Sequence, residues 1–331
     1  MMDEPTVCEL LRANWRNLGK GHRVVKQDSA EVQMNATIDS NTSKPEEKMR
    51  WSAKVTKSNL VTLLVCYVAL SPVFGMGLYN HLLFFPFKEN YDLKEVFAKI
   101  ETATNSKKSD VTIASGKEKL NGWLFKKSGA KKIILVSHGN GGEIAHRLLL
   151  VSPMLFANAS VLLYDYEGYG RSTGQPSVAA LKQDGLAAYD YVANELHYTP
   201  DNIVVFGESL GSGVTTYIAE HRKVAAVIIQ SGFSSLSSAA KDRIFWLNFY
   251  PPVAFDGVEM DNLAYLRGAH PPVLLMHGDK DTVLPIKNGY KMLAEASDPK
   301  RFVKFDGCGH NDVCVAKNFA PSLTQFISEL P

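Results

Sequence analysis

The sequence GESLG at residues 207–211 places a serine where it could act as a nucleophile. It follows an apolar, β-branched run, Ile203 to Phe206, and precedes small residues that can form a helix, Ser212 to Glu220. In such a strand, turn and helix, glycines on either side let the backbones approach and leave the serine hydroxyl clear of the chain. The pattern predicts a nucleophile at Ser209. The alternative is an ordinary strand–helix turn.

A serine nucleophile needs a base and a carboxylate that orients the base, and two later loops offer both. The sequence GCGHND at 307–312 follows a predicted strand, and its small residues suit a loop that presents the ring of His310. The sequence HGDKDTVLP at 277–285 follows another predicted strand and supplies two competing carboxylates, Asp279 and Asp281. The remaining carboxylate would be a solvated loop residue or a turn former.

Acyl transfer also requires backbone N–H groups aimed at the developing oxyanion. The sequence SHGNGG at 137–142 closes a predicted strand with a glycine-rich turn that can offer one donor. The N–H of Leu210, directly after the serine, can offer the second. The alternative is a glycine loop that only closes the strand. A phosphate site is disfavoured because no G-x-x-x-x-G-K-[ST] pattern occurs.

The cysteines do not indicate a metal centre. Cys308, His310 and Cys314 resemble part of a zinc site, but a fourth ligand is missing from the pattern. We therefore expect neither a metal nor a cofactor. The four cysteines are too scattered for a disulfide framework, although Cys308 and Cys314 could pair in an oxidising compartment.

Strand and helix patterns alternate through the carboxyl-terminal two thirds of the chain. Repeated units with β-branched strands indicate a mostly parallel sheet covered on both faces. The expected strands are 110–115, 120–126, 132–137, 160–166, 203–206, 224–230, 272–276 and 302–305, with helices over 144–156, 178–196, 212–220, 285–296 and 315–330.

The alternation stops between the strands at 224–230 and 272–276, which predicts a lid insertion over about 232–270. Ligand sites are mostly apolar, so aromatic residues here could line an acyl pocket. They could equally pack the lid against the domain. The candidate substrate-binding residues are Phe245, Trp246, Phe249 and Tyr250.

The amino-terminal part divides into a polar leader, 1–48, expected to be disordered, and an uncharged apolar run, Leu60 to Tyr79. A bilayer-spanning helix needs about 20 such residues, so we expect a transmembrane anchor over 58–80. A buried helix or a cleaved signal sequence are the alternatives. Lys and Arg residues are denser before the run than after it, which predicts a single-pass protein with its large domain on the non-cytoplasmic side.

Composition narrows the class of partner. The chain has 331 residues, 45% of them hydrophobic, and a formal charge of +2. No basic stripe interleaved with aromatic residues occurs, so no nucleic-acid partner is expected. The expected partners are a membrane and a lipid-like or acylated substrate.

These motifs together resemble those of the α/β-hydrolase superfamily, and in particular its membrane-anchored, Bem46-like proteins. The resemblance runs from about residue 82 to 331 and rests on FFP at 84–86, HGNGG at 138–142, DYEGYGRS at 165–172, GESLG, HGDKDTVLP and GCGHND. It implies an eight-stranded α/β-hydrolase fold with a short lid. It also implies these roles: Ser209 as nucleophile, His310 as base, Asp281 rather than Asp279 as acid, and the N–H groups of Asn140 and Leu210 as oxyanion hole. Glu208, inside the elbow, varies among such proteins and receives no role.

The predicted function is that of a membrane-anchored serine hydrolase that cleaves an acyl ester or thioester of a lipid or an acylated protein. The first alternative is a serine peptidase or amidase on the same fold. The second is a membrane-tethered binding protein without turnover, which an intact set of Ser209, Asp281 and His310 disfavours.

Overall fold

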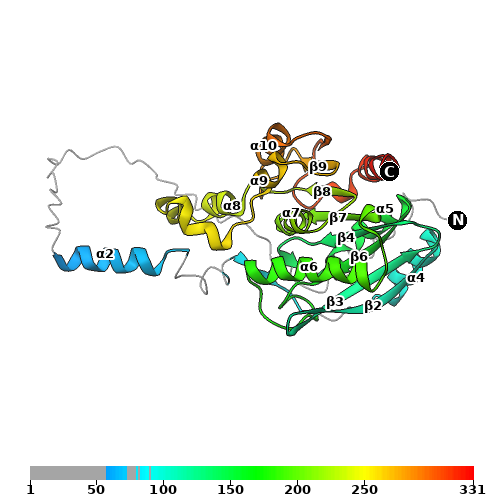
Figure 1. Cartoon of the computed structure of the whole chain (residues 1–331), viewed down its shortest axis with the longest axis horizontal. Coiled ribbons are helices and arrows are strands. Elements are labelled where there is room, and N and C mark those ends of the chain that lie inside the picture. The colour runs from blue at the N-terminus through cyan, green and yellow to red at the C-terminus, as the bar shows by residue number, and fades with distance from the viewer. Residues whose placement is uncertain (1–56, 73–79, 81–82, 89–90) are drawn as a thin grey trace, which may run out of the picture.

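The computed structural model describes residues 57–72, 80, 83–88 and 91–331. Its centre is an eight-stranded sheet in the order β10-β9-β8-β7-β4-β6-β3-β2 (Figure 1). The strands are β2 (Ser106–Ser115), β3 (Glu118–Lys127), β4 (Lys132–Ser137), β6 (Ala159–Tyr164), β7 (Ile203–Glu208), β8 (Ala226–Gln230), β9 (Val273–Gly278) and β10 (Lys300–Phe305). Neighbours from β10 to β6 are parallel, whereas β3 pairs antiparallel with β6 and with β2. The predicted mostly parallel sheet is confirmed.

Alternate side chains of the central strands enter two separate cores, as the two-residue period of a strand requires. On β4, Val136 faces the core shared with α4, α5 and α11, whereas Leu135 faces the core shared with α6, α7 and α10. Phe206 and Val205 divide in the same way on β7. Both faces are thus covered, which is why these strands are continuously apolar. The helices are α4 (Lys94–Thr104), α5 (Leu148–Phe156), α6 (Val178–Asn194), α7 (Gly211–His221), α10 (Lys287–Glu295) and α11 (Phe319–Ser328), with short 3-10 turns η1 (Ile144–Arg147), η2 (Pro200–Asn202) and η5 (Val313–Val315).

Two helices differ from expectation. The helix predicted over 144–156 starts as the 3-10 turn η1, and α5 begins only at Leu148. The closing helix, predicted from 315, begins at Phe319, because Ala316 has extended backbone angles after η5. Helix α4 was not predicted. Its buried residues Val96, Ile100 and Ala103 lie three and four positions apart, the spacing that could have indicated it.

The predicted insertion lies between β8 and β9 and is helical. It contains α8 (Leu236–Arg243), η3 (Phe245–Phe249), η4 (Pro252–Val258) and α9 (Asn262–Arg267), and we call residues 232–270 the lid. A small core of its own holds the lid together, formed by Ala240, Leu247, Tyr250 and Phe255.

The predicted leader 1–48 lies outside the described residues. So do residues 73–79 of the anchor predicted over 58–80. The described part is the 13-residue helix α2 (Lys57–Ala69). It ends three residues before Pro72, because a proline lacks an N–H and disfavours helical conformation in the residue before it. The described helix thus covers the first part of the predicted anchor, and the anchor itself stays a prediction. None of the helices in the described ranges combines the length and apolar character needed to cross a bilayer.

Candidate active site

Ser209 lies between β7 and α7 with a φ of 52°, in the left-handed region that L-residues other than glycine rarely adopt. Its neighbours make this strained turn possible. A Cβ at Gly207 would collide with the backbone of Gly211, and a Cβ at Gly211 would collide with the carbonyl of Ser137 on β4. The Ser209 N–H donates to the Gln230 carbonyl at 2.9 Å, which fixes the turn to β8. The strand–turn–helix that the sequence indicated is present, with Ser209 at its apex.

His310 lies in the loop after β10 and joins Ser209 to Asp281. The distance from His310 Nε2 to Ser209 Oγ is 2.9 Å, and the distance from His310 Nδ1 to Asp281 Oδ2 is 2.7 Å. An ionised carboxylate can only accept, so the imidazole proton lies on Nδ1 and Nε2 accepts from the serine hydroxyl. The structure thus brings the three side chains from three separate loops into one hydrogen-bonded chain.

Asp281 is buried yet strongly held as an anion. Its Oδ1 accepts the backbone N–H groups of Val283 and Leu284, both at 2.8 Å. Burial acts to raise the pKa of Asp281, but its contacts with His277 and His310 outweigh burial and hold that pKa well below its usual range. Asp281 therefore stays negative at neutral pH and can stabilise a positive charge on His310.

The competing carboxylate, Asp279, has a different partner. Its Oδ1 accepts the N–H of Gly307 at 2.7 Å, and its own N–H donates to the Phe305 carbonyl at 3.1 Å. Asp279 thus fixes the turn after β10, in the loop that carries His310. Of the two aspartates, the structure places Asp281 against the imidazole.

The candidate oxyanion loop, residues 138–142, is tied to the segment that follows the predicted anchor. Asn140 accepts from the Tyr169 hydroxyl at 2.9 Å and from the Phe85 N–H at 3.2 Å, and its amide donates to the Leu83 carbonyl. A two-stranded parallel pair, β1 (Phe85–Pro86) with β5 (Gly141–Gly142), continues this contact. These bonds fix the backbone of Asn140, whose N–H is one of the predicted oxyanion donors.

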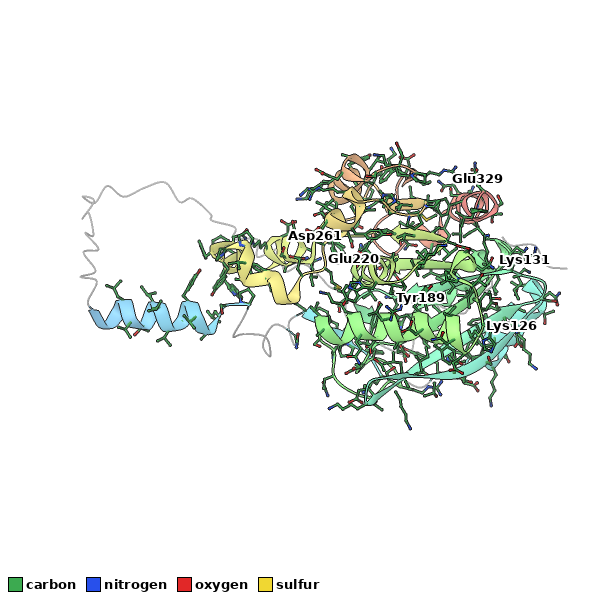
Figure 2. The ribbon with its side chains drawn as sticks, in the orientation of Figure 1. Lys126, Lys131, Tyr189, Glu220, Asp261 and Glu329 are labelled. Carbon is green, nitrogen blue, oxygen red and sulfur yellow. The ribbon has the colours of Figure 1, made fainter. Side chains whose placement is uncertain are left out.

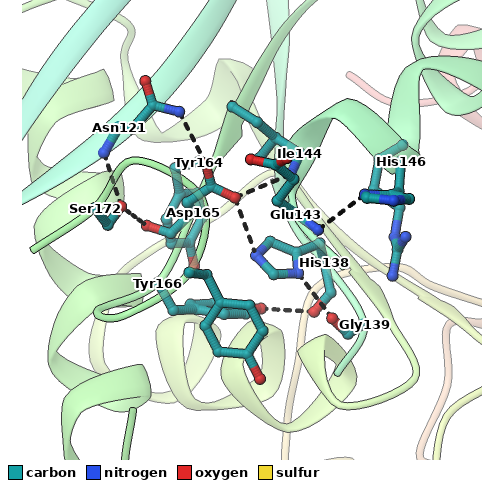
Figure 3. Close-up of polar contacts among 12 residues, drawn as sticks. Asn121, His138, Gly139, Glu143, Ile144, His146, Tyr164, Asp165, Tyr166 and Ser172 are labelled. Carbon is teal, nitrogen blue, oxygen red and sulfur yellow. Dashed lines mark hydrogen bonds and ion pairs between the residues drawn. The ribbon is translucent and has the colours of Figure 1, made fainter. Parts of the chain in front are cut away.

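Beneath this loop lies a buried polar network (Figure 3). His138 bonds the Gly139 carbonyl through Nδ1 at 2.7 Å, and the Tyr166 hydroxyl donates to the His138 carbonyl at 2.9 Å. Burial lowers the pKa of His138 to about 3, so the ring is neutral. Its Nε2 lies 3.8 Å from Asp165 Oδ1. Asp165 in turn accepts the Ile144 N–H at 2.9 Å. The DYEGYGRS motif therefore supports the loop from below.

Glu208, to which the sequence assigned no role, forms a buried ion pair with Arg147. Arg147 Nε lies 2.5 Å from Glu208 Oε2, and both side chains are largely buried. The same guanidinium donates from Nη2 to the Gly141 carbonyl at 2.8 Å. Arg147 therefore links the elbow to the candidate oxyanion loop, and sequence reasoning missed it. A charged residue next to a buried nucleophile was the available signal, because a buried carboxylate requires a cation.

The cysteines near His310 are free thiols in the structure. Cys308 is half-buried, and burial raises the pKa of Cys314 to about 12. Within residues 57–72, 80, 83–88 and 91–331, no group of three His, Cys, Asp or Glu side chains could hold a metal ion. The pairing of Cys308 with Cys314 that the sequence left open is not present.

Comparison with known proteins shows which family the chain belongs to. A family model described as the prolyl oligopeptidase family matches residues 179–310. An uncharacterized protein of Mycobacterium tuberculosis is 34% identical over 59% of this chain and 69% of its own length. Alpha/beta hydrolase domain-containing protein 17C of Xenopus tropicalis is 30% identical over 61% of this chain and 64% of its own length. The chain belongs to the α/β-hydrolase superfamily.

The solved structures agree with this α/β-hydrolase assignment at the level of the fold. The Pyrococcus furiosus esterase Pf2001 matches with a TM-score of 0.59, covering 75% of this chain and 98% of the esterase, at 17% identity. A likeness at that identity indicates a shared fold alone. Ser209, Asp281 and His310 follow the chain order of α/β-hydrolases, in which the acid precedes the histidine.

The four lid aromatics proposed to bind substrate separate into two kinds in this α/β-hydrolase. Tyr250 is only 6% exposed and belongs to the core of the lid, in line with the packing alternative. Phe245, Trp246 and Phe249 are exposed on the lid. The sequence shows the aromatic run, but it does not predict which rings are buried. The reason is that η3 is a short 3-10 turn without a sustained period.

Ser231 is a further residue near the site that sequence reasoning missed. It follows β8 with a φ of 49°, and its hydroxyl donates to the His310 carbonyl at 3.3 Å. Its N–H donates to the Met276 carbonyl of β9 at 2.8 Å. Ser231 therefore helps to hold the backbone of the loop that carries His310.

Proposed function

We propose that this α/β-hydrolase is a serine hydrolase that cleaves an acyl ester or thioester through an acyl-enzyme on Ser209. The supporting observation is the hydrogen-bonded chain from Asp281 through His310 to the Ser209 hydroxyl, with distances of 2.7 and 2.9 Å. Such a chain activates a hydroxyl that is otherwise a weak nucleophile at neutral pH.

In acylation, Ser209 Oγ attacks the carbonyl carbon while His310 Nε2 takes the hydroxyl proton. Asp281 remains ionised and stabilises the imidazolium that forms. Collapse of the tetrahedral intermediate breaks the bond to the leaving group, and His310 returns the proton to the departing oxygen or sulfur. The acyl group then remains as an ester on Ser209.

The N–H groups of Asn140 and Leu210 are the proposed donors to the oxyanion. Loss of one such donor typically lowers the rate about 10²- to 10³-fold. The bonds from the Asn140 side chain to Leu83, Phe85 and Tyr169 support this role, because they hold the loop against two neighbouring segments. In deacylation, His310 takes a proton from water, the hydroxide attacks the acyl carbon, and Ser209 leaves with the proton.

The exposed apolar residues of α2 and the lid favour a lipid or an acylated protein over a small polar substrate. A peptidase is the second candidate, because the matching family model describes prolyl oligopeptidases. A panel of acyl esters, acyl thioesters, lysophospholipids and aminoacyl amides separates the two. Faster turnover of the amides than of the esters would favour the peptidase.

The tether over 58–80, with the large domain on the non-cytoplasmic side, is also a proposal. The exposed apolar side chains of α2 support the tether. Protease protection in sealed vesicles of known orientation tests the side. Digestion of the large domain from the cytoplasmic face would overturn the proposed orientation.

Labelling with a fluorophosphonate probe tests the enzyme itself. The full chain should react, and Ser209→Ala should not. Ser328→Ala, which removes an exposed hydroxyl on α11, is the matched control and should label like the wild type. An unlabelled native chain, or equal labelling of Ser209→Ala, rules out the mechanism.

A further inference from the structure

From Leu60 to its end at Ala69, helix α2 presents apolar side chains on every side. All residues from 60 to 70 are exposed, and none carries a charge. Leu63, Leu64 and Val65 are 60 to 64% exposed at three successive positions, which point about 100° apart around a helix. Figure 2 shows side chains projecting from both sides of α2. A helix that is hydrophobic all round requires an apolar medium around it, whereas a protein groove would cover only one side.

The lid carries a second exposed apolar group. Phe245, Phe249 and Val253 are 73, 63 and 69% exposed, and Trp246 lies beside them in η3. No charged residue occurs between Ile244 and Phe255. These side chains are not needed for the lid core, which Leu247, Tyr250 and Phe255 fill. A contiguous exposed group of this kind indicates an interaction surface.

The two groups are joined through two tyrosines. The rings of Tyr67 on α2 and Tyr250 in the lid stack with centroids 4.6 Å apart. The Tyr250 hydroxyl donates to the Tyr67 carbonyl at 2.7 Å, and the Tyr67 hydroxyl donates to the Phe249 carbonyl at 3.2 Å. Figure 1 shows α2 extending from the lid end of the molecule, away from the sheet. A medium that surrounds α2 therefore also meets the lid.

We propose that α2 and the lid residues Phe245, Trp246, Phe249 and Val253 form one lipid-facing surface, which places the lid in the interfacial layer of a phospholipid membrane. The absence of a polar face on α2 favours lipid over a protein partner. Tryptophan and phenylalanine suit the boundary between acyl chains and headgroups.

Charge supports the same orientation. Arg243 is exposed in the last turn of α8, directly before the apolar stretch, where it can meet anionic headgroups while it donates to the Val283 carbonyl at 3.2 Å. Lys241, in the same turn, lies over the ring of Phe255 with its ammonium 4.6 Å from the ring centroid. The acidic residue between them, Asp242, pairs with Lys287 at 3.7 Å. Lys126, Lys131 and Glu329 lie at the opposite end of the molecule from α2 (Figure 2). The proposal goes beyond hydrolysis and does not depend on the chemistry at Ser209.

The fluorescence of Trp246 tests this surface in the full chain. The protein is reconstituted into vesicles of phosphatidylcholine and phosphatidylglycerol, with or without bromine on the acyl chains. The difference in emission between the wild type and Trp246→Phe isolates this residue from the other tryptophans. We expect bromine to quench that difference signal and aqueous iodide to leave it unquenched.

A matched control places the same probe on an exposed aromatic position of another element. In the Trp246→Phe chain, Tyr290→Trp on α10 should be quenched by iodide and not by bromolipid. Iodide quenching of Trp246 in vesicles would overturn the proposal. Protection from both quenchers would also overturn it, because a protein partner or second copy would then cover the lid. Fluorophosphonate labelling of the same samples reports the hydrolase separately, so the two proposals fail independently.

Discussion

Arg147 and Glu208 form an ion pair directly beside the nucleophile turn, with Arg147 Nε 2.5 Å from Glu208 Oε2. Glu208 is the residue before Ser209, and Arg147 also donates to the Gly141 carbonyl of the candidate oxyanion loop. Gly139 lies against the same pair, since a Cβ there would come within 3.2 Å of Arg147 Nη2 and 3.3 Å of Glu208 Oε1. One guanidinium therefore sets the spacing between the two parts of the site.

Removing Arg147 should affect both stability and rate. Breaking a buried pair by removing one partner costs about 3–5 kcal/mol, because it leaves the other charge uncompensated. A displacement of the oxyanion loop by about 1 Å can lower the rate about 10²-fold. We expect Arg147→Ala to lower the denaturation midpoint and kcat, with KM changed far less. Denaturant unfolding and steady-state kinetics on a soluble ester measure both.

The double variant Arg147→Met with Glu208→Met separates the two effects. Replacing both charges with apolar groups of similar size can be neutral for stability. Stability should therefore recover, while kcat stays low because the bond to Gly141 remains absent. Recovery of kcat together with stability would show that the pair acts only on folding.

The two aspartates of the HGDKD sequence should behave differently when each is changed to asparagine. Asp281→Asn removes the anion that fixes the imidazole tautomer, and the equivalent change in a serine protease lowers kcat about 10⁴-fold. Asp279→Asn keeps an acceptor for the Gly307 N–H and should retain most of the turnover. Turnover of an ester by the purified variants decides the assignment, and the reverse result would move the acid to Asp279.

Asp184 should make stability depend on pH. Its Oδ1 accepts from the Ser115 hydroxyl at 2.7 Å and its Oδ2 from the Glu167 N–H at 2.8 Å. Burial raises the pKa of Asp184 from 3.8 to about 7. The folded chain thus binds the proton more tightly than the unfolded chain, so this contribution is present below about pH 4 and is lost as the pH rises to about 7.

Asp184→Asn should remove this dependence, because its amide can donate to Ser115 and accept from Glu167 at any pH. Relative to the variant, the wild type should lose on the order of 1–4 kcal/mol of stability between about pH 4 and pH 7. Urea unfolding of both chains at a series of pH values gives the difference. The subtraction cancels groups common to both chains, such as Asp165 and His138. A difference that does not change with pH would contradict the assignment.

The parts of this molecule that sequence predicts are those set by neighbours along the chain. The continuous apolar runs of β4 and β7 predicted the sheet, and two glycines predicted the nucleophile turn, because local backbone requirements determine both. The ion pair between Arg147 and Glu208 joins separate elements, so only the fold reveals it. Asp281 could be predicted only in part. The loop sequence offered two candidate carboxylates, and the resemblance to the superfamily favoured Asp281 over Asp279.

The lid contains both a buried aromatic residue that packs its core and an exposed one that does not. Tyr250 is buried and stacked on Tyr67, whereas Phe245, a neighbour in the same aromatic run, is exposed. Truncating a buried aromatic residue costs about 3–5 kcal/mol, whereas a surface change usually stays within about 0.5 kcal/mol. Tyr250→Ala should therefore loosen the lid, and limited proteolysis should cut between α8 and α9 faster than in the wild type. Phe245→Ala is the control and should be cut at the wild-type rate. Equal protection of both variants would mean that the core of the lid does not depend on Tyr250.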